Sequence, residues 1–486
     1  MMQKTIILGI GLILFGCTVG PNYTAPTLAN TPKQWSTDLS PNTTTHNPLA
    51  EEWWLAFNDP ILKQLIKDAI AANLDLKQAA LRIKEARTQR WITLTAGLPS
   101  LSAKSSVTKR FNNFQTGGQP TASGSSFGAG NQVMNIFQMG FDAQWELDLF
   151  GGERRALEAA DATIDSEIEN SRQILVTLLG EVANNYIQLR NYQQLSLITQ
   201  NNLKSQQDTV SLTKTRQQAG FISYLEVAQA QTEAANTEAF LPDYDTIVKQ
   251  SLHSLSILLN KAPNALAPLL TQPQAIPQLH NPELSTLPSE LLTRRPDIRL
   301  AERLIAKASA NIGVATADLY PRVNLAAFIG LQNSKLTDFT PVGKSWSAAS
   351  SLSLPIFNWG KINANIKSKK IQHELAFLDY QKTVLSAFKE VEDALIAYKN
   401  EQTRHQTLTM AVNSSQLALE MANERYNKGL TMFLDVLQSQ NSLYQTQRDL
   451  VDSQAKLAVD LVALYKALGG GWQNQLNTNK DALPKS

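Results

Sequence analysis

The chain repeats itself, and this duplication constrains its fold more than any other feature of the sequence. In the C-terminal part of each copy, a displacement of 209 residues pairs Arg216 with Arg425, Gly220 with Gly429, Leu225 with Leu434, Glu226 with Asp435 and Gln229 with Gln438. Closer to the N-terminus the displacement becomes 222 and pairs Asp75 with Asp297. Such displacements indicate two copies of one structural unit. We expect repeat 1 at 53–261 and repeat 2 at 291–468, joined by a Pro-rich connector at 262–290.

Each copy is predicted to open with a helix, at about 59–90 and 297–317, followed by a β-hairpin at about 98–150 and 321–357. Apolar residues alternate with polar ones in these hairpins, which is typical of half-buried strands. In copy one the apolar positions are Phe137, Met139, Phe141, Ala143, Trp145, Leu147 and Leu149. In copy two they are Val323, Leu325, Ala327, Ile329 and Leu331, then Trp346, Ala348, Leu352, Leu354 and Ile356. Strands of about ten to thirteen residues can cross a bilayer when tilted.

Four such strands cannot close a membrane barrel, because the smallest membrane barrels have about eight. Two chains would supply eight strands, but a barrel of about that size is filled by its own side chains. Three chains would supply twelve and leave a lumen. The strand count therefore favours several chains that share one barrel.

Each copy ends in very long helical sequence, predicted at 153–218 and 221–260, and again at 361–428 and 432–468. A helix of about 65 residues is on the order of 100 Å long. A seven-residue apolar series follows the third of these helices through Val391, Tyr398, Val412, Leu419 and Tyr426, with His405 interrupting it. Such a series lets helices pack side by side with slight left-handed supercoiling.

The N-terminus has the layout of a secretory signal at 1–16, with Lys4 before an apolar stretch that leads into Leu14-Phe15-Gly16-Cys17. One interpretation is a lipobox, in which Cys17 receives lipid such as palmitate and becomes the mature N-terminus. The other is a signal cleaved after a small residue, with a leftover thiol. In the lipobox interpretation, a lipidated N-terminal arm occupies 17–52. A threonine rather than an acidic residue directly after the cysteine, here Thr18, resembles the arrangement in lipoproteins that are sent to the outer membrane. At the other end, Gly469-Gly470-Gly471 is predicted to end the last helix, and the tail at 469–486 to be poorly ordered.

Four stretches resemble the TolC-like outer membrane efflux proteins, in particular their lipoprotein branch of the OprM and NodT type. The stretches are Cys17-Thr18-Val19-Gly20-Pro21-Asn22-Tyr23, Arg294-Arg295-Pro296-Asp297-Ile298-Arg299, Leu354-Pro355-Ile356-Phe357 and Arg425-Tyr426-Asn427-Lys428-Gly429. The resemblance implies a mixed α and β membrane protein. It would be a homotrimer with a twelve-stranded outer-membrane β-barrel, four strands per chain, continued by a twelve-helix α-barrel through the periplasm.

The resemblance also implies a function and partners. The chain would be the passive exit duct of a tripartite efflux pump for drugs or similar small molecules. It would dock through a periplasmic adaptor protein onto an inner-membrane transporter of the resistance-nodulation-division type. Gly343-Lys344-Ser345 matches the end of the P-loop pattern, but Asp338 stands at the position of the first glycine, so the pattern is not met. Energy must therefore come from that partner.

The same resemblance implies a gate at the periplasmic tip. Gly220 and Gly429 stand where one helix ends and the next begins, and glycine tolerates the positive φ of such turns. Leu434 would form an apolar constriction, or else be a core residue between helices. Asp435 and Gln438 would form a polar ring beside it, and Tyr426 would help to hold the closed state. Gln438 stands where many relatives carry a second acidic residue.

Composition and motifs argue against other classes of protein. A net charge of +2 with 18% charged residues is unlike a nucleic-acid binder, and one Cys with five scattered His leaves no metal or cofactor site in view. The pattern Gly124-Ser125-Ser126-Phe127-Gly128 lies in a Gly/Ser-rich linker, whereas a nucleophile elbow needs a strand before it and a helix after it. We therefore expect no enzyme.

Two other functions remain open. The first is an outer-membrane duct for protein secretion by an ABC-type pump, and the second is a lipid-anchored coiled-coil scaffold or adhesin. The pair Trp53-Trp54 is predicted to be packing at the equator of the helical barrel, and Asp75 and Asp297 to help start helices.

Overall fold

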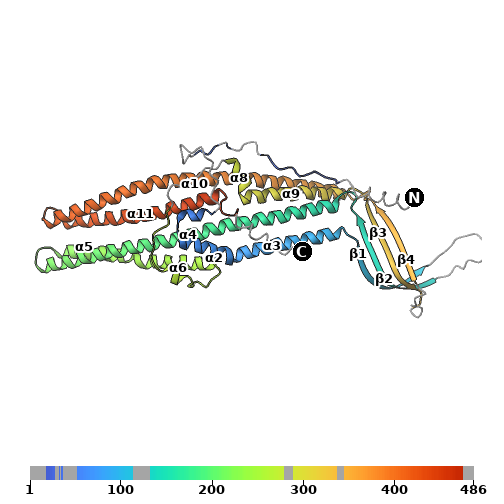
Figure 1. The fold of residues 1–486 in the computed structure, drawn as a ribbon, viewed down its shortest axis with the longest axis horizontal. Coiled ribbons are helices and arrows are strands. Elements are labelled where there is room, and N and C mark those ends of the chain that lie inside the picture. The colour runs from blue at the N-terminus through green and yellow to red at the C-terminus, as the bar shows by residue number, and fades with distance from the viewer. Residues whose placement is uncertain are drawn as a thin grey trace, which may run out of the picture. The chain divides into compact units, whose positions relative to one another are not determined.

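A computed structural model describes residues 18–27, 32, 34–36, 52–112, 132–278, 288–335 and 344–473 (Figure 1). The chain divides into two compact units. The strand unit contains the described residues of Met1–Pro26, Lys84–Asp165 and Arg303–Leu378. The helical unit contains those of Thr27–Ile83, Ser166–Glu302 and Asp379–Ser486. The duplicated halves of the sequence thus contribute to both units.

The strand unit is built on one antiparallel sheet in the order β1-β2-β3-β4. Its strands are β1 (Ser100–Asn112), β2 (Gln132–Leu147), β3 (Arg322–Asn333) and β4 (Lys344–Ser353). The β2–β3 pairing joins the two sequence repeats, with Gly140 opposite Gly330. Each repeat therefore gives one hairpin, and the two hairpins form a single four-stranded sheet.

The predicted alternation continues in register across this sheet. Phe141 lies opposite both Ala103 and Ile329, and Ile329 lies opposite Trp346. Directly opposed residues of antiparallel strands share a face, so these side chains form one apolar row. In the single chain Phe141 is 54% exposed, Ile329 66% and Trp346 77%. The sheet thus presents an apolar face that its own chain leaves uncovered.

The last strand ends earlier than the alternation predicts. Leu354 and Ile356 were expected in the strand, but β4 ends at Ser353. Pro355 explains the difference, because it has no N–H for the ladder and restricts the residue before it. The turn that follows brings the rings of Phe357 and Trp359 to 4.9 Å.

The helices of the chain include two very long ones, α4 (Gly152–Gln218) and α10 (Lys361–Asn427), of 67 residues each. The division between the units falls inside α3 (Leu74–Ala96), α4, α9 (Pro296–Ala317) and α10. The other helices belong to the helical unit: η1 (Trp53–Phe57), α2 (Pro60–Ala72), α5 (Tyr224–Glu238), α6 (Phe240–Leu258), α7 (Ala267–Leu270), α8 (Pro288–Arg294) and α11 (Phe433–Ala467). No helix in the described ranges is both long and apolar enough to cross a membrane.

Two predicted helices are each divided in the structure. The one expected at about 59–90 is α2 followed by α3, because the side-chain oxygen of Asn73 accepts from the amides of Asp75 and Leu76 and starts a new helix. Asp75 lies in the first turn, as expected, but Asn73 is the cap. The one expected at 221–260 is α5 followed by α6, because Pro242 has no N–H to donate to the carbonyl four residues earlier.

The C-terminal residues after α11 are packed where the sequence suggested a poorly ordered tail. Trp472 is 9% exposed and donates from Nε1 to the Arg294 carbonyl at 3.1 Å. The guanidinium carbon of Arg172 lies 4.3 Å from the centre of its ring, a cation–π contact. The described chain is therefore held in place up to Gln473. Residues 474–486 lie outside the described part of the chain.

The connector predicted at 262–290 is not wholly irregular. It contains α7 and the first residues of α8, while residues 279–287 lie outside the described part. The seven-residue series packs as predicted near Val391 and Tyr398, which are 0% and 3% exposed. Further along α10, Val412, Leu419 and Tyr426 are half-buried.

Candidate functional site

The turns between the long helices have the same geometry in both copies. Gly220 and Gly429 have φ of 78° and 72°, and nothing lies within 4 Å of a Cβ placed on either. Phe221 N–H donates to Arg216 O, and Leu430 N–H donates to Arg425 O, both at 2.9 Å. These are the 6→1 bonds of a Schellman motif, which closes a helix C-terminus. Glycine is thus required here by backbone conformation alone.

The helices after the two turns start differently. In copy one Ser223 caps α5, and its hydroxyl accepts from the Leu225 amide at 3.2 Å. The equivalent residue in copy two is Met432, which has no such oxygen. There the Asp435 carboxylate reaches back, accepting from the Met432 amide at 3.3 Å and from the Thr431 hydroxyl. Asp435 therefore stabilises the N-terminus of α11, independently of any role in a gate.

Tyr426 joins the two helical hairpins near their turns. Its hydroxyl donates to Glu226 Oε2 at 3.0 Å, across 200 residues of sequence. The guanidinium carbon of Arg216 lies 5.2 Å from the ring centre, and Arg216 Nη2 donates to Asn427 Oδ1 at 3.2 Å. Helices α4 and α5 of copy one are thereby linked to α10 of copy two.

Burial raises the pKa of the Tyr426 hydroxyl above its ordinary value. The hydrogen bond to Glu226 raises this pKa further, while Arg216 acts in the opposite direction. The phenol therefore stays protonated at neutral pH and keeps its donor role.

An apolar cluster supports this link. Ala230, Phe433, Val436 and Leu437 are buried together, with Tyr426 and three other partly buried side chains packed against them. The rings of Tyr426 and Phe433 are 5.4 Å apart. Because Phe433, Val436 and Leu437 of α11 pack into this cluster, the residues of α11 that lie between them in sequence point away from it.

Leu434, Asp435 and Gln438 lie on that other face of α11. Leu434 is 52% exposed, and Asp435 and Gln438 are exposed as well. Gln438 follows Leu434 by four residues and Asp435 by three, so it neighbours both on the helix surface, and the three form a single exposed patch. In the single chain Leu434 is not the core residue that one interpretation of the sequence expected.

The structure brings the predicted site residues into two neighbouring groups. Tyr426 belongs to the partly buried link with Glu226 and Arg216, and Leu434, Asp435 and Gln438 belong to the exposed patch. Sequence reasoning missed Glu226 and Arg216 as members of the link. The 209-residue displacement gave a signal for both, because it pairs them with Asp435 and Arg425. Cys17 lies outside the described residues.

The Tyr426–Glu226 bond can be tested by Tyr426→Phe. We expect the hairpins to separate more readily by about 1 kcal/mol, the typical net value of one such hydrogen bond. Hydrogen exchange at the Phe221 and Leu430 amides should quicken accordingly. In a Glu226→Ala background, which has no side-chain acceptor for the Tyr426 hydroxyl, the same substitution should have a smaller effect. An equal effect in both backgrounds would show that the two side chains are not coupled.

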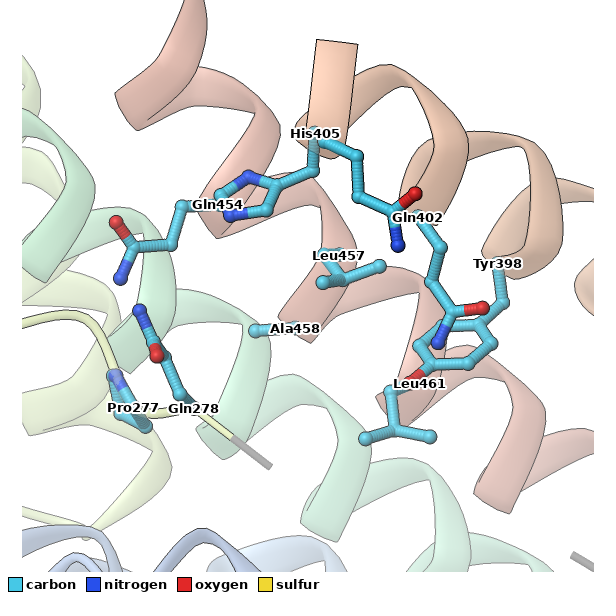
Figure 2. A pocket seen from close by; sticks show the side chains of 10 residues that line it. Pro277, Gln278, Tyr398, Gln402, His405, Gln454, Leu457, Ala458 and Leu461 are labelled. Carbon is cyan, nitrogen blue, oxygen red and sulfur yellow. The ribbon is translucent and has the colours of Figure 1, made fainter. Parts of the chain in front are cut away.

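The helical unit also contains a cavity of about 370 Å³ (Figure 2). Helix α10 contributes Tyr398, Gln402 and His405, and α11 contributes Gln454 and the apolar residues Leu457, Ala458 and Leu461. His405 thus occupies the gap in the apolar series as a cavity-lining residue. Its Nδ1 is buried without a hydrogen-bond partner among the residues described. Across those residues, no group of three or more His, Cys, Asp and Glu side chains could hold a metal ion.

Comparison with known sequences identifies the family. The profile described as outer membrane efflux protein matches residues 65–261 and 287–470. The chain is 33% identical over 472 residues to the antibiotic efflux pump outer membrane protein ArpC of Pseudomonas putida, covering 95% of this chain and 94% of that protein. It is 30% identical over 466 residues to nodulation protein T of Rhizobium leguminosarum bv. trifolii, covering 95% and 96%.

Solved structures agree with the sequence comparison. The outer-membrane channel OprN has a TM-score of 0.83 and 31% identity, covering 94% of this chain and 100% of that chain. CusC, from a study of transmembrane channel formation, has a TM-score of 0.81 and 26% identity, covering 94% and 100%. These likenesses extend over both units and confirm the fold class predicted from the sequence. The chain therefore belongs to the outer membrane efflux protein family.

Proposed function

We propose that the protein is the outer-membrane exit duct of a tripartite efflux pump. One observation carries this proposal: the apolar row Ala103–Phe141–Ile329–Trp346 crosses a four-stranded sheet and is left exposed by its own chain. Strands β1 and β4 are edge strands, each with one partner in the described sheet. Unpaired strand edges are expensive in lipid unless other strands close them, whereas an exposed apolar face is expensive in water and favourable in lipid.

Three copies satisfy this requirement. They supply twelve strands, enough for a barrel with a lumen, and the apolar face of the sheet would meet lipid. The long helices of the three chains would form the twelve-helix barrel below it in the periplasm. The fold shared with outer-membrane channels supports this assembly.

The relatives point to the cargo and partners. They include a toluene efflux pump outer membrane protein and a solvent efflux pump outer membrane protein, as well as the antibiotic efflux component. We extend this to drugs and apolar solvents as the substrates of this chain. A periplasmic adaptor and an inner-membrane transporter would complete the pump and supply its energy. The duct itself performs no catalytic step in this proposal.

Lipidation of Cys17 is a further part of the proposal. The lipobox at 14–17 supports it, and Thr18 in place of an acidic residue favours the outer membrane. Mass spectrometry of the mature N-terminal peptide should show an acylated cysteine as the first residue.

The patch on α11 would form the gate. In a trimer the exposed Leu434, Asp435 and Gln438 of three chains would surround one axis, giving an apolar constriction beside a polar, cation-attracting ring. The partly buried Tyr426–Glu226 link would hold the hairpins in the closed arrangement. Gly220 and Gly429 would form the turns at the tip.

Opening this gate by mutation gives a direct prediction. Leu434→Ala combined with Asp435→Ala should raise the single-channel conductance of purified trimers in planar bilayers, because three side chains are shortened at each level. Leu225→Ala is the matched control, since Leu225 is the equivalent of Leu434 in copy one and is 64% exposed. It should leave conductance unchanged. An unchanged conductance in the double variant would remove Leu434 and Asp435 from the gate.

Deleting the chromosomal copy tests the function as a whole. We expect greater susceptibility to antibiotics and solvents, restored by the wild-type chain, with secreted proteins unaffected. Loss of a secreted protein with unaltered susceptibility would instead favour a duct for an ABC-type secretion system. Neither change would favour the scaffold or adhesin.

A further inference from the structure

The cavity lined by α10 and α11 has the size and lining of a small-molecule site. Its volume of about 370 Å³ lies within the range of roughly 300–1,000 Å³ that ligand pockets occupy. Its wall combines apolar residues of α11 with four glutamine side chains, Gln278, Gln402, Gln406 and Gln454 (Figure 2). An apolar surface with a few polar groups around it is typical of sites that bind and orient an organic molecule.

His405 contributes a directed hydrogen-bond donor to this wall. Its Nδ1 is buried and has no partner among the residues that the structure describes. A buried N–H without an acceptor is more costly than a lone pair without a donor, so the neutral ring carries its proton on Nε2. Because Nδ1 is covered while the residue lines the cavity, the Nε2–H group is available to an oxygen acceptor there.

The lining also selects against charged ligands. Among the described residues that line the cavity there is no Asp, Glu, Lys or Arg. The charges closest in sequence neutralise one another, since Glu401 accepts from Arg404 Nη1 at 3.0 Å and lies 3.4 Å from Lys456 Nζ. An ion would therefore lose its hydration in the cavity without meeting an opposite charge.

The walls of the cavity are held in place without a ligand. Glu401 of α10 is 5% exposed and accepts a hydrogen bond from the Ser453 hydroxyl of α11. These two residues directly precede Gln402 and Gln454, which line the cavity. The bond thus fixes α10 against α11 beside the site, and little binding energy is spent on ordering the walls.

The other copy of the repeat shows that helix packing does not require this neutral lining. The displacement of 209 residues pairs Gln454 with Asp245 and Ala458 with Lys249. Lys249 Nζ donates to Asp245 Oδ2 at 2.6 Å, so copy one carries an exposed ion pair at these positions. Copy two has a neutral amide and a short methyl side chain instead, which leave the space open and uncharged.

We propose that this cavity binds small uncharged aromatic molecules that carry a hydroxyl or carbonyl oxygen. The ligand ring would lie on Leu457, Ala458 and Leu461, and the ring of Tyr398 would favour an aromatic partner. The ligand oxygen would accept from His405 Nε2, and the glutamine amides would serve other polar groups at the edge of the ring. The site is separate from the patch on α11 that would form the gate, so it is a binding function beyond the proposed duct.

Binding of 2-naphthol to the full-length protein in detergent tests the site. Isothermal titration calorimetry at pH 7, with the detergent-only titration subtracted, should show saturable binding with a dissociation constant on the order of 0.1–1 mM, as expected for about eleven non-hydrogen atoms. Naphthalene lacks the oxygen, and 2-naphthoate carries a charge. Each should bind at least about fivefold more weakly than 2-naphthol.

Two variants locate the binding. Ala458→Leu should abolish it, because the longer side chain occupies the cavity. Ala463→Leu is the matched control and should bind normally, since Ala463 is exposed on the same helix and does not line the cavity. His405→Phe keeps an aromatic ring but removes the donor. It should weaken 2-naphthol about fivefold and leave naphthalene unchanged.

The absence of saturable binding to the wild-type chain would overturn the site. Equal binding of 2-naphthol to the wild-type chain and Ala458→Leu would show an adventitious apolar site elsewhere and would overturn it as well. Should Ala458→Leu fail to fold, His405→Phe decides, because unaltered discrimination between 2-naphthol and naphthalene would contradict the proposal. Tighter binding of 2-naphthoate than of 2-naphthol would overturn the uncharged class of ligand. None of these outcomes bears on the duct, whose conductance is measured separately.

Discussion

Trp53→Ala should lower the free energy of unfolding of the helical unit by about 3–5 kcal/mol, the range for losing a buried Trp or Phe side chain. Trp53 is 1% exposed and stacks on Tyr465 at 5.5 Å. The rings of Trp54 and Phe57 meet it edge-on at 5.7 and 6.2 Å. Removing the indole would leave a cavity that rigid helices on several sides cannot fill. Urea unfolding of the detergent-solubilised protein, followed by circular dichroism, measures the change.

Trp91→Ala is the control for this experiment. Trp91 is 61% exposed in the chain, so its loss should cost less than about 1 kcal/mol in the dissociated chain. Equal losses for the two variants would show that Trp53 is not a core residue. The result would also test the prediction from sequence that Trp53 and Trp54 are structural.

Arg295→Ala should lower the free energy of unfolding by about 2–3 kcal/mol, because it leaves the Ala467 carbonyl without its charged donor, while the Asp297 and Glu390 side chains, 23% and 55% exposed, can bond water instead. Arg295 is 6% exposed. It donates to both oxygens of Asp297, to Glu390 Oε2 at 2.7 Å and to the Ala467 carbonyl at 2.8 Å. It therefore ties the start of α9 to α10 and to the end of α11. The thermal midpoint should fall with the free energy.

Arg294→Ala is the matched control, because it is the carbonyl of Arg294, rather than its side chain, that accepts from Trp472. Burial alone would lower the pKa of Arg295, but Asp297 and Glu390 outweigh it and raise that pKa. A raised pKa in the folded state gives stability that is lost only as the pH rises through that pKa. The effect of Arg295→Ala should thus be constant from pH 6 to 9. A loss that varied over this range would argue against the ion-pair network.

The sequence predicted the repeating parts of this fold well, because they depend on local chemistry. A positive φ at Gly220 and Gly429 can be predicted from local sequence alone, because each glycine directly follows a helix. Period-two alternation in β2 and β3 needs no knowledge of the rest of the chain. The helix breaks at Asn73 and before Pro242 each had a signal in the sequence, an N-capping residue in the first case and a proline in the second. The long apolar patterns on both sides of each break nevertheless favoured one continuous helix.

The candidate site was predicted only in part, because its contacts join distant segments. Glu226 and Asp435 are equivalent in the duplication, yet Glu226 binds Tyr426 and Asp435 caps its own helix. The copies differ here at two positions: only Ser223 of the Ser223/Met432 pair can cap its helix, and Tyr426 has Gln217 as its counterpart in copy one. Likewise, the packing of Trp472 on Arg172 depends on how helices meet in three dimensions, which composition and spacing do not specify.

The central claim is that several chains pool their strands and helices to build a tube that one chain cannot make. Native mass spectrometry of the mature protein extracted from outer membranes tests it most directly. We predict a particle with the mass of three chains, released only by detergent. A monomer recovered in the soluble fraction without detergent would contradict the account.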